Sequence, residues 1–169
     1  DADVELDSLV VDGFDIGSVI GNTKYNGLTE AVEVDLNLSY RGNERFKIVG
    51  DYYPSKTEKQ LELESSFQDF NIATLEPFIA EYASELTGMV DGSISITGML
   101  TEPDLNGGLE IRDFNGKVNY LNTTYSIPQA QIKVERDMFA LDNGQIFDEK
   151  GGKATVHFQA FHDYFHEFS

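Results

Sequence analysis

Residues 88–111 read Gly88-Met-Val-Asp-Gly-Ser-Ile-Ser-Ile-Thr-Gly-Met-Leu-Thr-Glu-Pro-Asp-Leu-Asn-Gly-Gly-Leu-Glu-Ile111. Apolar and polar residues alternate in the first half, so one side receives Val90, Ile94, Ile96 and Leu100 and the other receives Asp91, Ser93, Ser95 and Thr97. A period of two is typical of a half-buried β-strand. Pro103 interrupts the run because it fixes φ and cannot donate a hydrogen bond, and Leu105, Leu109 and Ile111 then resume the apolar side. We predict a curved β-ribbon with one apolar and one acidic face, bent at its glycines.

The same alternation precedes this ribbon. Residues 30–40 form the clearest strand of the chain, because every second residue from Val32 onward is apolar or aromatic. Turns at residues 41–44 and 54–57 separate it from two further strands. The apolar side of these three strands consists of Val32, Val34, Leu36, Leu38, Tyr40, Phe46, Ile48, Tyr52, Leu61, Leu63 and Phe67. Residues 1–13 form another expected strand, and residues 15–21 a single helical turn with Asp15 as N-cap.

Alternation also follows the ribbon. The expected strands there contain the apolar residues Val118, Tyr120, Tyr125, Ile127, Ile132, Val134, Phe139, Leu141, Val156 and Phe158. Pro128 interrupts one of them, and turns are expected at residues 142–144 and 148–152.

One segment has a different period. Between residues 75 and 86, apolar side chains recur at spacings of three and four residues, at Phe78, Ile79, Tyr82, Ala83 and Leu86. This spacing is typical of one face of an α-helix. Thr74 can cap its start, Pro77 falls in the first turn and Gly88 can end it. We predict one short amphipathic helix of about three turns near residues 75–86.

Composition narrows the class of protein. The 169 residues suit a single domain spanning 1–169, and the formal net charge is -18, from 30 acidic and 12 basic residues. Nucleic-acid binding needs a basic surface and is therefore excluded, and anionic membrane surfaces would repel the chain. The sequence has no cysteine, no apolar run near the ~20 residues of a membrane span and no signal peptide. From its two ends we expect an internal segment of a longer protein.

The pattern poses a packing problem. Roughly ten strands supply one apolar face, and one short helix is the only other expected element. The sheet can close into a barrel, fold into a two-sheet sandwich, or stay open as a groove that a lipid or another partner fills. Periodicity does not separate these solutions, and the first two are the commoner ones in soluble proteins.

A series of motifs favours the open groove over the barrel and the sandwich. In chain order they are Pro77-Phe-Ile79, the glycine-spaced strand from Gly88 to Gly98, the turn at Pro103, Leu105-Asn-Gly-Gly-Leu109, Val118-Asn-Tyr120, Tyr125-Ser-Ile127, Phe139-Ala-Leu141 and Asp148-Glu-Lys-Gly-Gly-Lys-Ala154. Residues 70–165 thereby resemble the C-terminal half of TamB-type translocation and assembly module proteins of the AsmA-like superfamily. Residues before 70 fit more loosely, and the extra glycine at 151 or 152 departs from the pattern.

The resemblance implies an all-β fold, a long antiparallel-rich sheet folded into an open half-pipe (a β-taco) with an apolar interior. It also implies a periplasmic protein, anchored in the inner membrane by an N-terminal helix absent from this sequence, that conducts phospholipid to the outer membrane. A BamA-like outer-membrane barrel is the implied protein partner. The candidate lipid-contacting residues are Val34, Leu36, Leu38, Phe46, Ile48, Leu61, Leu63, Ile94, Ile96, Leu109, Ile111, Val118, Tyr120, Ile132, Phe139, Val156 and Phe158. The alternative is an interaction or chaperone module for outer-membrane protein assembly that buries its apolar face and recruits an incoming β-strand.

Residues with catalytic or metal-binding chemistry are sparse. His162 and His166 are four residues apart and could bind a metal on a helix, but a polar turn explains them better. Asp142, Asn143, Asp148 and Glu149 lack the spacing of a calcium loop and suit hairpin turns. No nucleophile–base or nucleotide-binding motif occurs. We therefore expect no enzyme activity and no cofactor.

Overall fold

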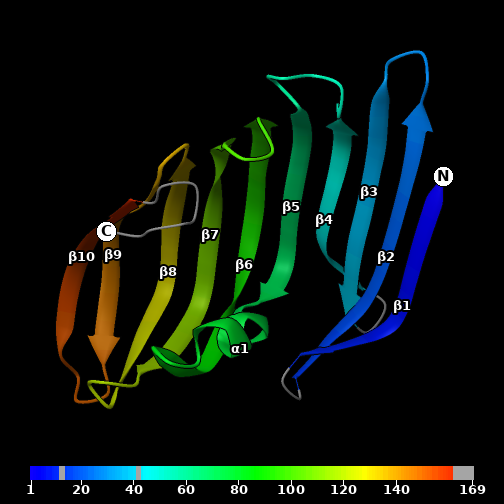
Figure 1. The fold of residues 1–169 in the computed structure, drawn as a ribbon. Helices are drawn as coiled ribbons and strands as arrows, with labels where there is room; N and C mark the ends of the chain where they lie inside the picture. Colours follow the sequence, from blue (N-terminus) through cyan, green and yellow to red (C-terminus); the bar gives the residue numbers. More distant parts are fainter. Residues whose placement is uncertain (12–13, 41–42, 162–169) are drawn as a thin grey trace.

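The computed structural model describes residues 1–11, 14–40 and 43–161, which form one antiparallel sheet of ten strands (Figure 1). The spatial order is β1 to β10, so each strand pairs with its neighbours in the chain. The strands are β1 (Ala2–Val11), β2 (Phe14–Asn26), β3 (Ala31–Tyr40), β4 (Asn43–Tyr52), β5 (Leu61–Asn71), β6 (Ala83–Gly98), β7 (Pro103–Val118), β8 (Thr123–Glu135), β9 (Met138–Asp148) and β10 (Lys153–Phe161).

The sheet is open. Within the described residues β1 pairs with β2 alone and β10 with β9 alone, so the first and last strands do not join. The expected curved, open, all-β sheet is confirmed, and the closed barrel and the two-sheet sandwich are not formed.

Strand register places the apolar residues in rows that cross the sheet. One row of paired positions runs through Val19, Leu38, Phe46, Phe67, Gly92, Leu109, Ile132, Leu141 and Phe158. The next row runs through Gly21, Leu36, Ile48, Ser65, Ile94, Gly107, Val134 and Phe139. A polar row alternates with them through Asp3, Asn22, Asp35, Val49, Glu64, Ser95 and Asn106. Paired residues share one face of a sheet, so the two sets of rows form opposite faces.

Two glycines mark points where a side chain would collide with the next strand. Gly50 on β4 has φ 139° and Gly92 on β6 has φ 137°, a region that only glycine occupies readily. A methyl group at Gly92 would lie 2.2 Å from the carbonyl oxygen of Gly108 on β7. Such positions allow a strand to bend and its backbone to lie close to the next strand.

The connection from β5 to β6 corrects the predicted helix. It consists of a 3₁₀ turn, η1 (Ile72–Leu75), and a single helical turn, α1 (Glu76–Ile79). Asn71 caps η1 by accepting from the Ala73 N–H, and Pro77 lies in the first turn of α1. Residues 83–86 belong to β6 instead, because Ala83 pairs with Val118 on β7. Strand pairing gives backbone groups of this segment partners on β7, whereas a short isolated helix is only marginally stable.

Two smaller expectations are also wrong. Residues 15–21 are part of β2 rather than a helical turn, since Val19 and Gly21 pair with Leu38 and Leu36. Residues 142–144 do not form a turn, because β9 continues through them with an irregularity at Asn143, whose φ is 56°. The turn at residues 148–152 is confirmed, with Asp148 accepting from the Lys150 and Gly152 N–H groups. The expected turn at residues 41–44 includes two residues outside the described part of the chain.

The bend at Gly92 can be tested by adding a methyl group. We expect Gly92→Ala to lower the free energy of unfolding by about 2–3 kcal/mol, because the new side chain meets both an unfavourable φ and the β7 backbone. Gly21→Ala is the matched control, because nothing lies within 4 Å of the added carbon there. Its unfolding energy should change by less than about 0.5 kcal/mol in urea titrations. Equal losses for both variants would contradict the proposed role of Gly92.

Candidate apolar groove

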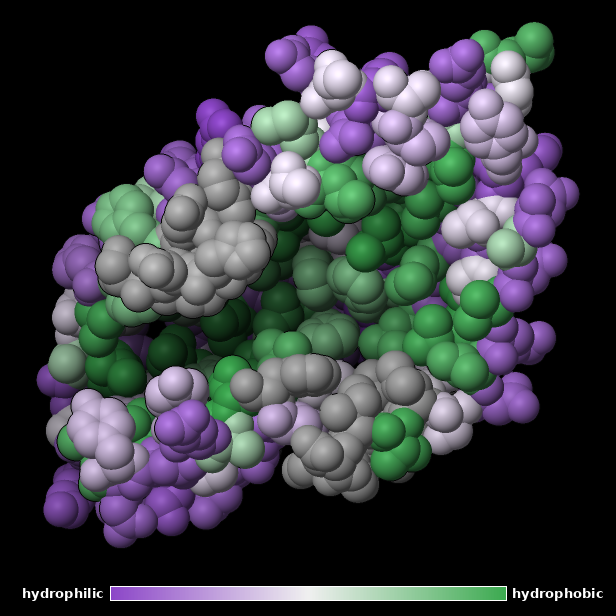
Figure 2. All heavy atoms as spheres, in the orientation of Figure 1, coloured by the Kyte–Doolittle hydropathy of each residue, from purple (hydrophilic) through white to green (hydrophobic). Residues whose placement is uncertain are grey.

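Most of the candidate lipid-contacting residues fall on one face of the sheet. Leu36, Ile48, Ile94 and Phe139 share one row, and Leu38, Phe46, Leu109, Ile132 and Phe158 share the next. A third row pairs Val34 with Gly50, Leu63, Ile96 and Leu105. Leu61 and Ile111 belong to rows on the same face. Figure 2 shows a hollow where hydrophobic residues gather, with hydrophilic residues around its rim.

Most of these side chains are half-buried. Leu38 and Leu61 are buried, Phe158 is exposed, and the other candidates on the strands are half-buried. A closed barrel or sandwich would bury such a set almost completely. The apolar face is therefore the wall of an open groove, in which side chains pack against their row neighbours and still reach solvent.

Two candidates lie at the end of β7 rather than in the middle of the face. Val118 is the last residue of β7 and is half-buried. Tyr120 follows in the turn to β8 and is 85% exposed, so it does not line the groove. The strand ends there because Asn119 donates its backbone N–H to the Tyr82 carbonyl and its side-chain amide to the Ala80 carbonyl.

An aromatic cluster occupies the groove near the β5–β6 connection. Phe46, Phe67 and Phe70 lie with ring centroids 4.9 to 6.4 Å apart. Strict alternation would place Phe67 and Phe70 on opposite faces. The strand is irregular between them, where Asp69 has φ 46°, and this brings both rings to the groove. Asp tolerates this region better than most residues, which is the only signal of the irregularity in the sequence.

Further lining residues were absent from the candidate set. Val90, Leu105, Ala130 and Val134 are buried on the same face. The alternation of these residues with polar neighbours in the sequence is the pattern that could have identified them as groove-lining residues. Ser65 is the only buried polar residue among the described ones, and its hydroxyl donates to the Ile94 carbonyl at 3.0 Å. The groove therefore presents no unsatisfied hydroxyl at that point.

The outer face is charged and partly cross-linked by ion pairs. Arg112 on β7 donates to Asp91 on β6 at 3.1 Å and to Asp69 on β5 at 2.7 Å, and Arg45 on β4 lies 3.4 Å from Asp69. Partial burial raises the pKa of Asp91, but hydrogen bonds from the Asp69 N–H and from Arg112 outweigh it, so the pKa lies below its ordinary value. The hydrogen bonds that lower the pKa of Asp91 also tie β6 and β7 to the irregular stretch at Asp69.

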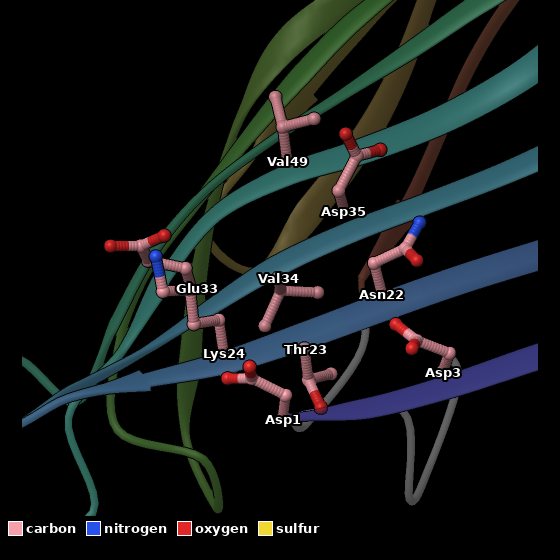
Figure 3. A pocket seen from close by; sticks show the side chains of 9 residues that line it. All are labelled: Asp1, Asp3, Asn22, Thr23, Lys24, Glu33, Val34, Asp35 and Val49. Carbon is pink, nitrogen blue, oxygen red and sulfur yellow. The ribbon is translucent and has the colours of Figure 1, made fainter.

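A shallow depression of about 460 Å³ lies on the polar side of β1 to β4 (Figure 3). Its lining includes Asp1, Asp3, Glu33 and Asp35, with Lys24 as the single cation. No group of metal-ligating side chains is assembled there or elsewhere among the described residues. His157 pairs with Asp142 at 2.8 Å on exposed surface, and the candidate ligands His162 and His166 lie outside the described residues. In the described part of the chain, no helix combines the length and the apolar character needed to cross a bilayer.

Comparison of the chain with protein families, curated proteins and solved structures finds no match. The groove and its chemistry therefore carry the functional argument, together with the sequence motifs.

A charge placed in the groove tests whether this face is open. We expect Ile96→Glu to fold with a loss of about 1–3 kcal/mol, because the half-buried position lets the carboxylate reach water. Leu61→Glu is the comparison, since Leu61 lies on the same face but is only 6% exposed, and it should lose substantially more. Thermal unfolding of both variants measures the difference. If Ile96→Glu unfolds the protein as completely as Leu61→Glu, position 96 is sealed and the groove is closed there.

Proposed function

We propose that this protein binds the acyl chains of phospholipid in its apolar groove. The observation that carries the proposal is the half-exposed apolar face, which extends from β2 to β10 and lies opposite a polar, acidic face. Exposure of such an apolar face to water is unfavourable, and a large exposed apolar patch usually marks a site where a ligand or a partner binds. An acyl chain lying against the rows would complete the burial that the sheet begins.

The chemistry of the wall suits a sliding ligand. Burial of each methylene group contributes ~0.8 kcal/mol, and this attraction has no preferred direction. Aliphatic side chains such as Leu36, Leu63 and Ile96 offer no hydrogen bond that would fix a ligand at one place. A lipid can therefore move along the rows at little cost, with its charged head group outside the groove.

The resemblance to TamB-type proteins supplies the cellular setting of the proposal. In that setting the protein is a periplasmic conduit segment that shields phospholipid tails between the inner and outer membranes and supports outer-membrane biogenesis. The full-length protein would be held in the inner membrane by an N-terminal helix. The acidic outer face is compatible with an aqueous compartment.

The exposed sheet edges favour a second candidate function, an assembly module for outer-membrane β-barrel proteins. β1 and β10 each present one row of backbone groups without a paired strand among the described residues. An incoming β-strand, for instance from a BamA-like barrel, could add to either edge. In this case the function resides in the edge backbone, and the groove need not hold lipid.

Photo-crosslinking distinguishes the two functions. We expect a photoreactive residue at Leu63, Ile96 or Leu109 to trap phospholipid in cells, because these side chains line the groove. The matched controls are Glu62, Ser95 and Glu110, each next in the chain to a test position but on the opposite face. Lipid adducts are measured by mass spectrometry of the purified, irradiated protein. Equal labelling of both faces, or none at all, rules out the groove as the binding site. Protein adducts from a photoreactive residue placed on β1 or β10 instead support the assembly module.

A further inference from the structure

The connection between β5 and β6 folds over the apolar face instead of leaving the sheet. Residues 72–82, which we call the strap, comprise η1, α1 and the three residues that lead to β6. η1 approaches β2 to within 8 Å between Cα atoms, as well as packing on β6. In a flat sheet β2 would lie about 14 Å from β5, given ~4.8 Å between neighbouring strands. The strap therefore reaches across the groove, and Figure 1 shows it in front of the lower ends of the central strands.

Ile72 anchors the strap in the groove. Its side chain is 6% exposed and belongs to a buried cluster with Leu38, Phe70, Leu86 and Val90. This cluster joins β3 on one side of the groove to β6 on the other, and Phe46 and Phe67 pack against it. The aromatic end of the groove is consequently covered by the chain itself.

Side chains of Glu76 and Asn119 tie the strap to the strands. The Glu76 carboxylate accepts from the Leu86 N–H at 2.9 Å, and the Asn119 amide donates to the Ala80 carbonyl at 2.8 Å. Leu75, Ile79 and Tyr82 are exposed. A single helical turn without a side-chain cap has little stability of its own, so packing of Ile72 and hydrogen bonds to the strands stabilise the strap.

We infer that the strap is a displaceable stop that closes the groove at its aromatic end. This inference rests on the proposed binding of acyl chains. A bound chain would lie parallel to the strands in the open part of the groove and end against Ile72, which follows the end of β5. The strap therefore sets the longest acyl chain that gains affinity. Lifting the strap exposes the aromatic cluster and extends the path.

The first test needs no lipid. The sequence has no cysteine, so one introduced thiol is the only one to react. Val90→Cys lies under the strap, where Val90 is 8% exposed, and Ile96→Cys lies on the half-buried wall outside the cluster. We expect Ile72→Ala to raise the rate at which a thiol reagent labels Val90→Cys by at least about tenfold, with no change at Ile96→Cys. Val134→Ala is the control, because it removes a fully buried side chain outside the strap cluster.

If Val134→Ala accelerates labelling of Val90→Cys as much as Ile72→Ala does, general loss of stability is the cause and the strap is not a cover. If neither changes the rate, the strap does not protect the cluster. Either result overturns the inference, whereas an effect confined to Ile72→Ala supports it.

The second test measures the affinity for lysophosphatidylcholines of increasing acyl length. Each added methylene should strengthen binding about fourfold until the chain end reaches the strap, after which affinity stays constant. In Ile72→Ala this ceiling should move to longer chains. No ceiling in the unmodified protein, or the same ceiling in both proteins, contradicts the stop. Absence of binding at every length overturns the proposed function and the stop with it, and the labelling rates still show whether the strap covers the cluster.

Discussion

Cross-strand register is the constraint on which the rest of the structure depends. In an unbroken meander each strand pairs with its chain neighbours, so a period of two in the sequence becomes continuous rows on one face. A slip of one residue between β5 and β6 would place Ile96 on the face opposite Leu63 and break the row. Because the sheet does not close, these rows are covered only by their mutual packing, by the curvature of the sheet and, among the described residues, by the strap.

The sequence predicts on which face of the sheet a residue lies, but it does not predict whether the sheet closes into a barrel. The alternation around Leu36 and Ile94 assigns their face without any knowledge of partners, and the register confirms it. Whether β1 meets β10 depends on the summed twist and bend of ten strands, which no local pattern reports. The preference for an open sheet came from the resemblance of ordered motifs to TamB-type proteins, not from periodicity.

The errors occur where one residue disturbs the alternation. Asp69 and Asn143 take positive φ inside strands, so the side chains after them change face without a glycine to signal it. The helix predicted to residue 86 ends at Ile79, because residues 83–86 belong to β6. Ala83 pairs with β7, the Leu86 N–H donates to the Glu76 carboxylate, and the Leu86 side chain is buried. The spacing of apolar residues alone does not show whether residues 83–86 are more stable in a helix or in a strand. The strap is the result, a short apolar segment between two long strands.

Native mass spectrometry of gently purified protein shows whether the groove takes up acyl chains. We predict adducts with phospholipid masses that disappear after delipidation and return when phospholipid is added. The Ile96→Glu protein should carry fewer of them, since a carboxylate on the wall opposes burial of methylene groups. A protein that stays lipid-free in the presence of phospholipid would mean that the groove does not bind acyl chains.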